Sequence, residues 1–128
     1  MMLNPSPKKI LVVDDEEDVL IPLSNTLKRA NYEVISTTKG KEAVELAIKL
    51  RPDLIIRDII LPDMGGTEVA AVLVENPSTT NIPIIFLTGI LTKQEEESIE
   101  GKTGKHYVIA KPVTVKELLE MVGKILFR

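Results

Sequence analysis

The sequence predicts an α/β domain in which a parallel β-sheet is covered by helices on both faces. Short apolar segments, typical of buried strands, alternate five times with segments of helical periodicity. The chain has 128 residues, which suits a single domain. Polar or charged residues also stand at the ends of four of the predicted strands, and a parallel sheet would bring those ends to one edge.

The chain is expected to start with an extended lead-in over residues 1–7, and residues 8–128 are expected to form the domain. The first strand, 9–13, is apolar and flanked by charge. A helix is predicted over 17–30, although Pro22 lies inside it and removes one backbone hydrogen bond.

The middle of the chain continues the alternation. Asn31 tolerates the left-handed conformation in which helices often end. The strand 33–37 is more polar and is expected at an edge of the sheet. The helix over 40–50 is stopped by Pro52, because the residue before a proline disfavours helical geometry. The strand 53–58 is the most apolar and is expected at the centre.

The last part repeats the pattern twice more. A short helix and a buried strand are predicted over 66–75 and 82–88. Residues 92–100 are strongly acidic and predict a short helix. The fifth strand is expected over 106–110, and 114–127 has the pattern of an amphipathic helix.

Composition excludes several classes of protein. Hydrophobic residues make up 44% and charged residues 27%, with a net charge of −3 and no basic patch for nucleic acid. There is no cysteine, which excludes disulfides and a thiol nucleophile. No apolar stretch approaches the roughly 18 residues of a membrane helix, and the first residues lack a signal peptide's apolar core. We therefore expect a cytoplasmic protein that binds neither nucleic acid nor membrane.

The polar residues at the strand ends form the candidate site: Asp14, Asp15, Asp58, Thr88 and Lys111. Carboxylates held together repel one another, and Mg²⁺ relieves that repulsion because it prefers oxygen ligands and needs only one or two carboxylates with a phosphate. An ionised Asp58 can then act as a nucleophile toward phosphorus, while Lys111 and Thr88 contact the phosphoryl oxygens. The pattern predicts Mg²⁺-dependent acceptance of a phosphoryl group.

Each residue alone also has an ordinary structural interpretation. The acidic run 14–18 would stabilise the start of a helix. Asp58 and Thr88 could be polar strand ends, and Lys111 could mark a junction between strand and loop. Four such placements at equivalent strand ends favour the functional interpretation. Arg57 is unexpected in an apolar strand, and it either reaches solvent beside the site or pairs with a carboxylate.

With these residues in place, the chain from 8 to 127 resembles the receiver domains of two-component response regulators. Val12-Val13-Asp14-Asp15 resembles the acidic pair of that family, and the segment 58–66 resembles the surroundings of its phosphorylated aspartate. Leu87-Thr88-Gly89 resembles the family's switch hydroxyl, and Lys111-Pro112 its lysine.

The resemblance implies a flavodoxin-like fold of three layers, with a doubly wound five-stranded sheet of order 2-1-3-4-5. It implies Mg²⁺ bound directly by Asp15 and Asp58, through water by Asp14, and by the backbone carbonyl of Ile60. It also implies that Asp58 accepts a phosphoryl group from phosphohistidine on a sensor histidine kinase or a histidine phosphotransfer protein.

A switch is implied as well. Thr88 and Lys111 would move toward the phosphoryl oxygens and bias a protein-binding surface made by the fourth helix, fifth strand and fifth helix. The downstream protein is not identified, and phosphorylation-dependent dimerisation through the fifth helix is left open. In this view the chain is a signalling phosphoacceptor and not an enzyme, apart from its own phosphorylation and dephosphorylation.

The chain departs from the family pattern in two places. Val108 stands where the family usually has an aromatic, three residues before the lysine. Tyr107 is adjacent, but successive strand residues face opposite sides. Residues 98–103 replace a stretch of small residues that is common before the fifth strand.

Two alternative interpretations stay open. The chain could be a receiver domain taken from a hybrid histidine kinase or a larger regulator. It could also be a Mg²⁺-dependent phosphohydrolase with Asp58 as nucleophile. That second alternative is disfavoured because Ile60 stands where an acid would be needed to protonate a leaving group.

Overall fold

The structure is a computed structural model, and it describes residues 7–58, 72, 75–88, 106–111 and 113–127. For Thr88 and His106 it describes the backbone alone. The helix predicted over 92–100 lies outside the described residues, as does most of the helix predicted over 66–75.

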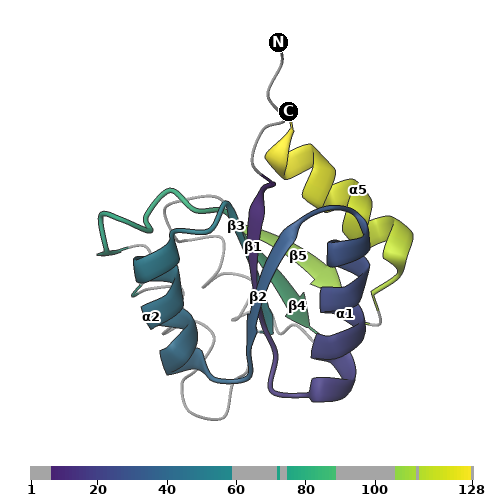
Figure 1. Cartoon of the computed structure of the whole chain (residues 1–128), viewed down its shortest axis with the longest axis horizontal. Coiled ribbons are helices and arrows are strands. Elements are labelled where there is room, and N and C mark those ends of the chain that lie inside the picture. Colours follow the sequence, from purple (N-terminus) through teal and green to yellow (C-terminus); the bar gives the residue numbers. More distant parts are fainter. Residues whose placement is uncertain (1–6, 59–71, 73–74, 89–105, 112, 128) are drawn as a thin grey trace.

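A single five-stranded sheet forms the middle of the molecule (Figure 1). Its strands are β1 (Lys9–Val13), β2 (Glu33–Thr37), β3 (Leu54–Asp58), β4 (Ile84–Thr88) and β5 (His106–Ala110). All pairings are parallel, and the order is β2-β1-β3-β4-β5. The predicted fold and strand order are therefore confirmed, with β2 at one edge and β3 at the centre. Sequence patterning placed the starts of β3 and β4 slightly too early.

Helices cover both faces of this sheet, as expected for right-handed crossovers between parallel strands. In Figure 1, α2 (Gly40–Leu50) lies on one side, while α1 (Glu17–Arg29) and α5 (Val115–Leu126) lie on the other. None of the helices within the described part of the chain is long and apolar enough to cross a membrane.

Alternating residues of each strand fill two separate apolar layers. In β1, Leu11 and Val13 pack in the layer under α2, and Ile10 and Val12 pack in the layer under α1 and α5. The strands are therefore apolar on both faces, which explains why they appear in the sequence as continuous runs rather than alternating patterns. This two-sided burial leaves the strand ends as the places where polar groups can stand.

The ends of the helices follow local sequence signals. Pro22 lies inside α1, as predicted. Asn31 has a φ of 71°, which confirms that it takes the left-handed conformation after α1. Arg51 ends α2 in the same region, with a φ of 45°. At the start of α5, the Thr114 hydroxyl accepts a hydrogen bond of 3.1 Å from the backbone N–H of Glu117. Such a cap satisfies a donor that the helix cannot pair internally.

Candidate functional site

The candidate site lies at the carboxyl edge of the sheet, where β1, β3 and β5 end. The register aligns these ends, since Val13 pairs with Arg57, Asp58 with Leu87, and Thr88 with Ala110. The residue that follows β1 and the one that follows β5 therefore reach the same edge as Asp58. Parallel pairing thus brings together groups that are far apart along the chain.

Three charged residues project from this edge toward the same side of the sheet. Asp14 continues the alternation of Ile10 and Val12, which face α1 and α5. Asp58 and Lys111 hold equivalent positions after Ile56 and Ile109, which belong to the same apolar layer. The pleat of the strands therefore selects these three side chains for mutual contact.

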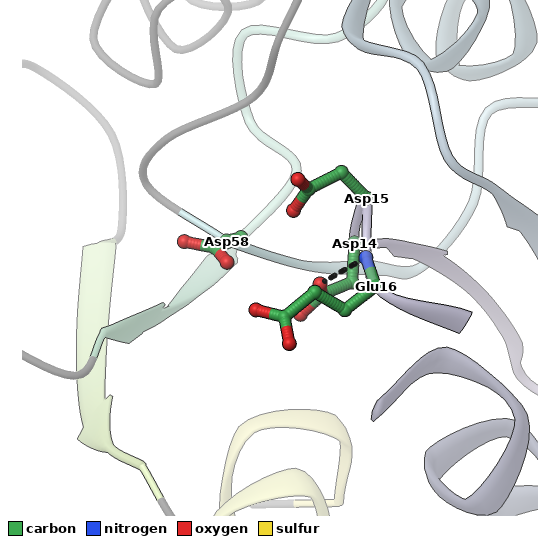
Figure 2. A group of neighbouring side chains, drawn as sticks. All are labelled: Asp14, Asp15, Glu16 and Asp58. Atoms are coloured by element: carbon green, nitrogen blue, oxygen red, sulfur yellow. Dashed lines mark hydrogen bonds between the residues drawn. The ribbon is translucent and has the colours of Figure 1, made fainter. Parts of the chain in front are cut away.

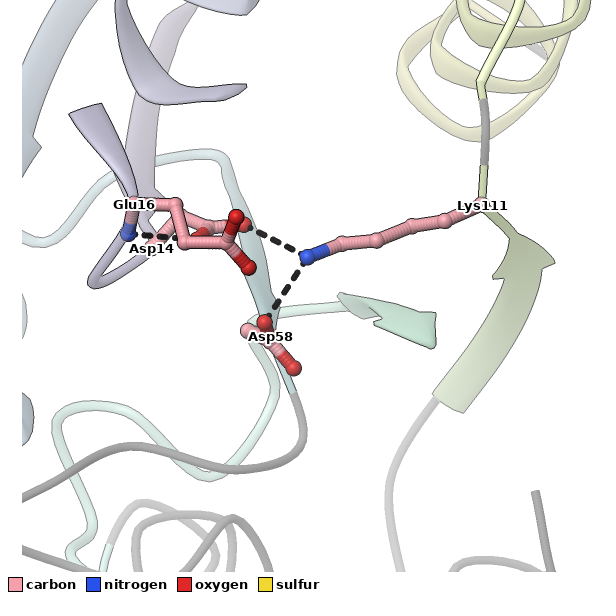
Figure 3. A network of polar contacts seen from close by, with 4 residues as sticks. All are labelled: Asp14, Glu16, Asp58 and Lys111. Atoms are coloured by element: carbon pink, nitrogen blue, oxygen red, sulfur yellow. Dashed lines mark hydrogen bonds and ion pairs between the residues drawn. The ribbon is translucent and has the colours of Figure 1, made fainter. Parts of the chain in front are cut away.

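The Lys111 ammonium lies between the two carboxylates (Figure 3). Its Nζ is 2.8 Å from Oδ2 of Asp58 and 3.1 Å from Oδ2 of Asp14. The Asp14 side chain is 0% exposed and that of Asp58 15%, so these ion pairs are largely removed from water. The second Asp14 oxygen accepts a hydrogen bond of 2.9 Å from the backbone N–H of Glu16. Both Asp14 oxygens are thus satisfied.

Burial and charge act in opposite directions on the pKa values here. Burial raises the pKa of Asp14, although the Glu16 amide and the Lys111 ammonium act to lower it. Burial acts to lower the pKa of Lys111, but its hydrogen bonds and charge interactions with Asp58 and Asp14 outweigh this and raise the pKa overall. Lys111 is therefore a permanent cation at neutral pH, held between two acids.

Four carboxylates gather at this edge (Figure 2). Asp14, Asp15, Glu16 and Asp58 each offer an oxygen, and these atoms all lie within 4.8 Å of one another. The sequence had indicated Asp14, Asp15 and Asp58 but not Glu16, which it treated as part of an acidic helix start. Its position directly after the acidic pair is the signal that would have included it. Oxygen ligands of this kind suit Mg²⁺.

The environment of Arg57 differs from one of the two predicted from the sequence. It is 0% exposed, so the interpretation in which it reaches solvent is wrong. It lies on the opposite face of β3 from Asp58, and its Cζ is 5.5 Å from the centre of the Phe86 ring. Burial lowers the pKa of Arg57 to about 10, while the charge of Asp58 acts to raise it. The guanidinium is therefore still protonated at neutral pH.

The remaining predicted residues are only partly described. The backbone of Thr88 ends β4 beside Ala110, and its side chain lies outside the described part. Ile60 also lies outside the described residues, as does the segment 98–103, which differs from the family pattern. Val108 is 39% exposed on β5, whereas the neighbouring Tyr107 packs inward against the layer under α1 and α5. The prediction that these two residues face opposite sides is confirmed.

Comparison with known proteins identifies the class. A family model described as the response regulator receiver domain matches residues 10–123. The chain therefore belongs to the response regulator receiver domain family. Members of this family are phosphoacceptor switches in two-component signalling, and they partner with histidine kinases or phosphotransfer proteins.

Individual relatives agree with this assignment. The chain is 35% identical over 116 residues to the polar-differentiation response regulator DivK of Brucella anthropi, covering 91% of this chain and 94% of that protein. Chemotaxis response regulator CheY4 of Vibrio cholerae has a similar structure, with a TM-score of 0.85, 29% identity, and coverage of 94% of this chain and 99% of that one.

A third similarity concerns the fold alone. The receiver domain of sensor histidine kinase PA1611 from Pseudomonas aeruginosa PAO1 aligns with a TM-score of 0.86 at 24% identity, covering 95% of this chain and 99% of that one. The solved structure of that domain has a magnesium ion coordinated in its active site cleft.

Proposed function

We propose that Asp58 is the phosphoacceptor of this receiver domain and that it takes its phosphoryl group from phosphohistidine on a sensor histidine kinase or a histidine phosphotransfer protein. The observation that carries the proposal is the contact of Lys111 with Asp58 at 2.8 Å, within an edge that holds four carboxylates. A nucleophilic carboxylate, a fixed ammonium and metal-binding oxygens are the groups that phosphoryl transfer requires.

Mg²⁺ fits the donor set at this edge, because its carboxylate oxygens lie within 4.8 Å of one another. In the proposal Asp15 and Asp58 bind the ion directly, Asp14 binds it through water, and the backbone carbonyl of Ile60 completes the protein ligands. When bound, the ion would neutralise charge on Asp58 and on the incoming phosphoryl oxygens. The magnesium ion in the active site cleft of the PA1611 receiver domain supports the choice of metal, and the ligand set is part of the proposal.

The transfer itself exchanges one bond to phosphorus for another. A carboxylate oxygen of Asp58 forms the new P–O bond while the P–N bond to the donor imidazole breaks. The electron pair of that bond stays on the imidazole nitrogen, which takes up a proton. Lys111 and the Thr88 hydroxyl would then contact the phosphoryl oxygens and stabilise the added negative charge. Asp14 would lose part of its contact with the ammonium.

A surface beside the site suits contact with a phosphodonor protein. A pocket of about 470 Å³ opens between α1 and the start of α5, and both Lys111 and apolar side chains line it. Ile21 on α1 and Val115 on α5 are large apolar residues that are 56% and 57% exposed. Exposed apolar groups of this kind are typical of interaction sites. The donor histidine would approach Asp58 from this side.

The proposal includes four further parts. Residues 8–128 form the receiver domain and 1–7 its lead-in. The phosphorylated domain switches a surface that includes β5 and α5 and that binds a downstream protein or a second copy, without direct contact to nucleic acid. The location is cytoplasmic. The only chemistry of the domain is its own phosphorylation and dephosphorylation, not turnover of small phosphate esters.

Intact-mass analysis after incubation with acetyl phosphate and Mg²⁺ tests the central step. The wild type should gain one phosphoryl group, and neither the Asp58→Asn variant nor a reaction containing EDTA should do so. An Asp53→Asn variant is the matched control, because Asp53 is an exposed aspartate that precedes β3 at its other end. Equal phosphorylation of wild type and Asp58→Asn would contradict the proposal.

A further inference from the structure

Glu16 adds a carboxylate to an edge where the other three already meet the needs of Mg²⁺. One oxygen of Glu16 and one each of Asp14, Asp15 and Asp58 all lie within 4.8 Å of one another. Mg²⁺ keeps several of its waters and is usually bound through one or two carboxylates together with a phosphate. Asp15 and Asp58 supply that number in the proposed function, and Asp14 acts through water. Glu16 therefore exceeds what this ion requires.

Helix capping does not account for the position of the Glu16 side chain. Glu16 is the N-cap residue of α1, but within the described part of the chain its side chain makes no capping hydrogen bond. Its backbone is held in place, because its N–H donates to Oδ1 of Asp14 at 2.9 Å. Figures 2 and 3 show the Glu16 carboxylate beside Asp14, on the side of the site where Asp58 lies. The side chain thus belongs to the metal-binding edge.

Ca²⁺ accepts more protein oxygens than Mg²⁺ does. It takes about six to eight oxygen ligands at roughly 2.3–2.6 Å in flexible geometry, whereas Mg²⁺ demands near-octahedral geometry at roughly 2.0–2.1 Å. Oxygens on opposite sides of the ion are therefore about 4.6–5.2 Å apart around Ca²⁺ and about 4.0–4.2 Å apart around Mg²⁺. Four carboxylate oxygens within 4.8 Å of one another match the number and the spacing that suit Ca²⁺.

We propose that Glu16 determines the metal specificity of this edge, because it provides a carboxylate that Ca²⁺ binds directly and that Mg²⁺ does not require. The inference rests on the proposed function, since it assumes that a divalent cation binds among Asp14, Asp15 and Asp58. Glu16 raises the affinity for Ca²⁺ more than the affinity for Mg²⁺. Ca²⁺ consequently competes with Mg²⁺ for the same carboxylates.

Titrations of the full chain with Mg²⁺ alone and with Ca²⁺ alone, followed by ¹H–¹⁵N NMR, test this inference, because the spectra report both folding and the dissociation constant. Glu16→Gln keeps the size of the side chain and removes its charge. Loss of a negative charge weakens both divalent ions and largely cancels in the ratio of their dissociation constants. Loss of a direct ligand affects Ca²⁺ alone, so the ratio of the Ca²⁺ constant to the Mg²⁺ constant should rise on the order of tenfold.

Glu17→Gln is the matched control. Glu17 is an exposed acid in the first turn of α1, directly after Glu16, and it is not one of the four carboxylates that gather at the edge. The variant removes the same charge from the same helix end, including its favourable interaction with the helix dipole. Its ratio of dissociation constants should stay within about twofold of the wild type.

The possible results lead to different conclusions. A higher ratio in Glu16→Gln, but not in Glu17→Gln, supports the inference. An unchanged ratio in Glu16→Gln, an equal rise in both variants, or a wild type that binds Mg²⁺ but not Ca²⁺ overturns it and leaves the proposed function intact. A wild type that binds neither ion overturns the inference together with the proposed Mg²⁺ site. Glu16→Ala replaces Glu16→Gln in this comparison if the glutamine variant does not fold.

Discussion

Lys111 and Asp58 lie 2.8 Å apart at their charged atoms, although 53 positions separate them in the chain. Their contact depends on the parallel pairing of β3 with β4 and of β4 with β5, which aligns the three strand ends. The ammonium also contacts the fully buried Asp14 at 3.1 Å. A single cation therefore contacts two acids at the place where a second positive group, a metal ion, is proposed to bind.

The Lys111→Met variant should be less stable than the wild type in the absence of Mg²⁺. Removing the ammonium leaves the Asp14 carboxylate buried without its ionic partner, which should cost about 1–3 kcal/mol of unfolding free energy. Urea denaturation in EDTA measures this loss. Added Mg²⁺ should reduce it, because the metal would replace the missing positive charge.

The matched control for that experiment is Lys49→Met. Lys49 is an exposed lysine on α2, so its removal should change stability by less than about 0.5 kcal/mol with or without Mg²⁺. Equal losses for the two variants, or no response of Lys111→Met to Mg²⁺, would contradict the prediction.

The Thr114→Ala variant should weaken the start of α5. The Thr114 hydroxyl accepts a hydrogen bond from the Glu117 N–H at 3.1 Å, and loss of an N-cap of this kind typically costs about 1 kcal/mol. Chemical denaturation should therefore show a lower midpoint with an unchanged slope. Thr114→Ser keeps the acceptor and should stay close to the wild type, and a serine variant as unstable as the alanine variant would argue against capping.

The Ser24→Ala variant should stabilise the protein. Ser24 is 5% exposed within α1, and its hydroxyl has no hydrogen-bond partner within the part of the chain that the structure describes. Removing a buried, unpaired hydroxyl should raise the unfolding free energy by about 1 kcal/mol. Asn25→Ala, at an exposed position of the same helix, measures the part of the gain that comes from helix propensity alone. A loss of stability in Ser24→Ala would show that the hydroxyl is satisfied.

The pKa of Tyr32 gives a stability prediction at alkaline pH. Burial raises this pKa above the ordinary value of 10.0, and the ring stacks on Phe127 with centroids 6.3 Å apart. Above pH 10 the folded protein therefore keeps a proton that the unfolded chain loses, so this contribution to stability is full below pH 10 and disappears as the pH rises through the folded pKa. Tyr32→Phe has no such dependence.

The difference in unfolding free energy between Tyr32→Phe and the wild type should consequently be constant from pH 8 to about pH 10 and should then shift in favour of the variant. Denaturation at matched ionic strength over this range provides the measurement. A difference that stays constant up to pH 11 would show that Tyr32 titrates alike in both states.

Much of the fold could be predicted from the sequence, because the apolar runs that form the strands and the residue that ends α1 were both strong signals. Apolar runs marked all five strands within two residues of their observed ends, and Asn31 marked the left-handed turn after α1. Arg51 was missed, because nothing in the chemistry of arginine favours a φ of 45° and the conformation is imposed by the helix end before Pro52.

The site was predictable to a similar degree. Strand ends in a parallel sheet are fixed by topology, so Asp14, Asp58 and Lys111 could be grouped before any coordinates were known. The environment of Arg57 could not be predicted in the same way. Alternation along β3 places it opposite Asp58, but only the packed structure shows that the far face is closed over it and that Phe86 lies beside it.

The cap of α5 stands three residues beyond Lys111 in the chain, and Ala110 just before it is pinned by pairing with Thr88. We expect any backbone shift that accompanies movement of the ammonium toward a new anion to reach α5, because its cap is so close along the chain. Such a shift would act on the first turn of the helix, where Glu117 donates its amide hydrogen to the Thr114 hydroxyl. The rate at which this amide hydrogen exchanges with solvent would then report on phosphorylation of Asp58.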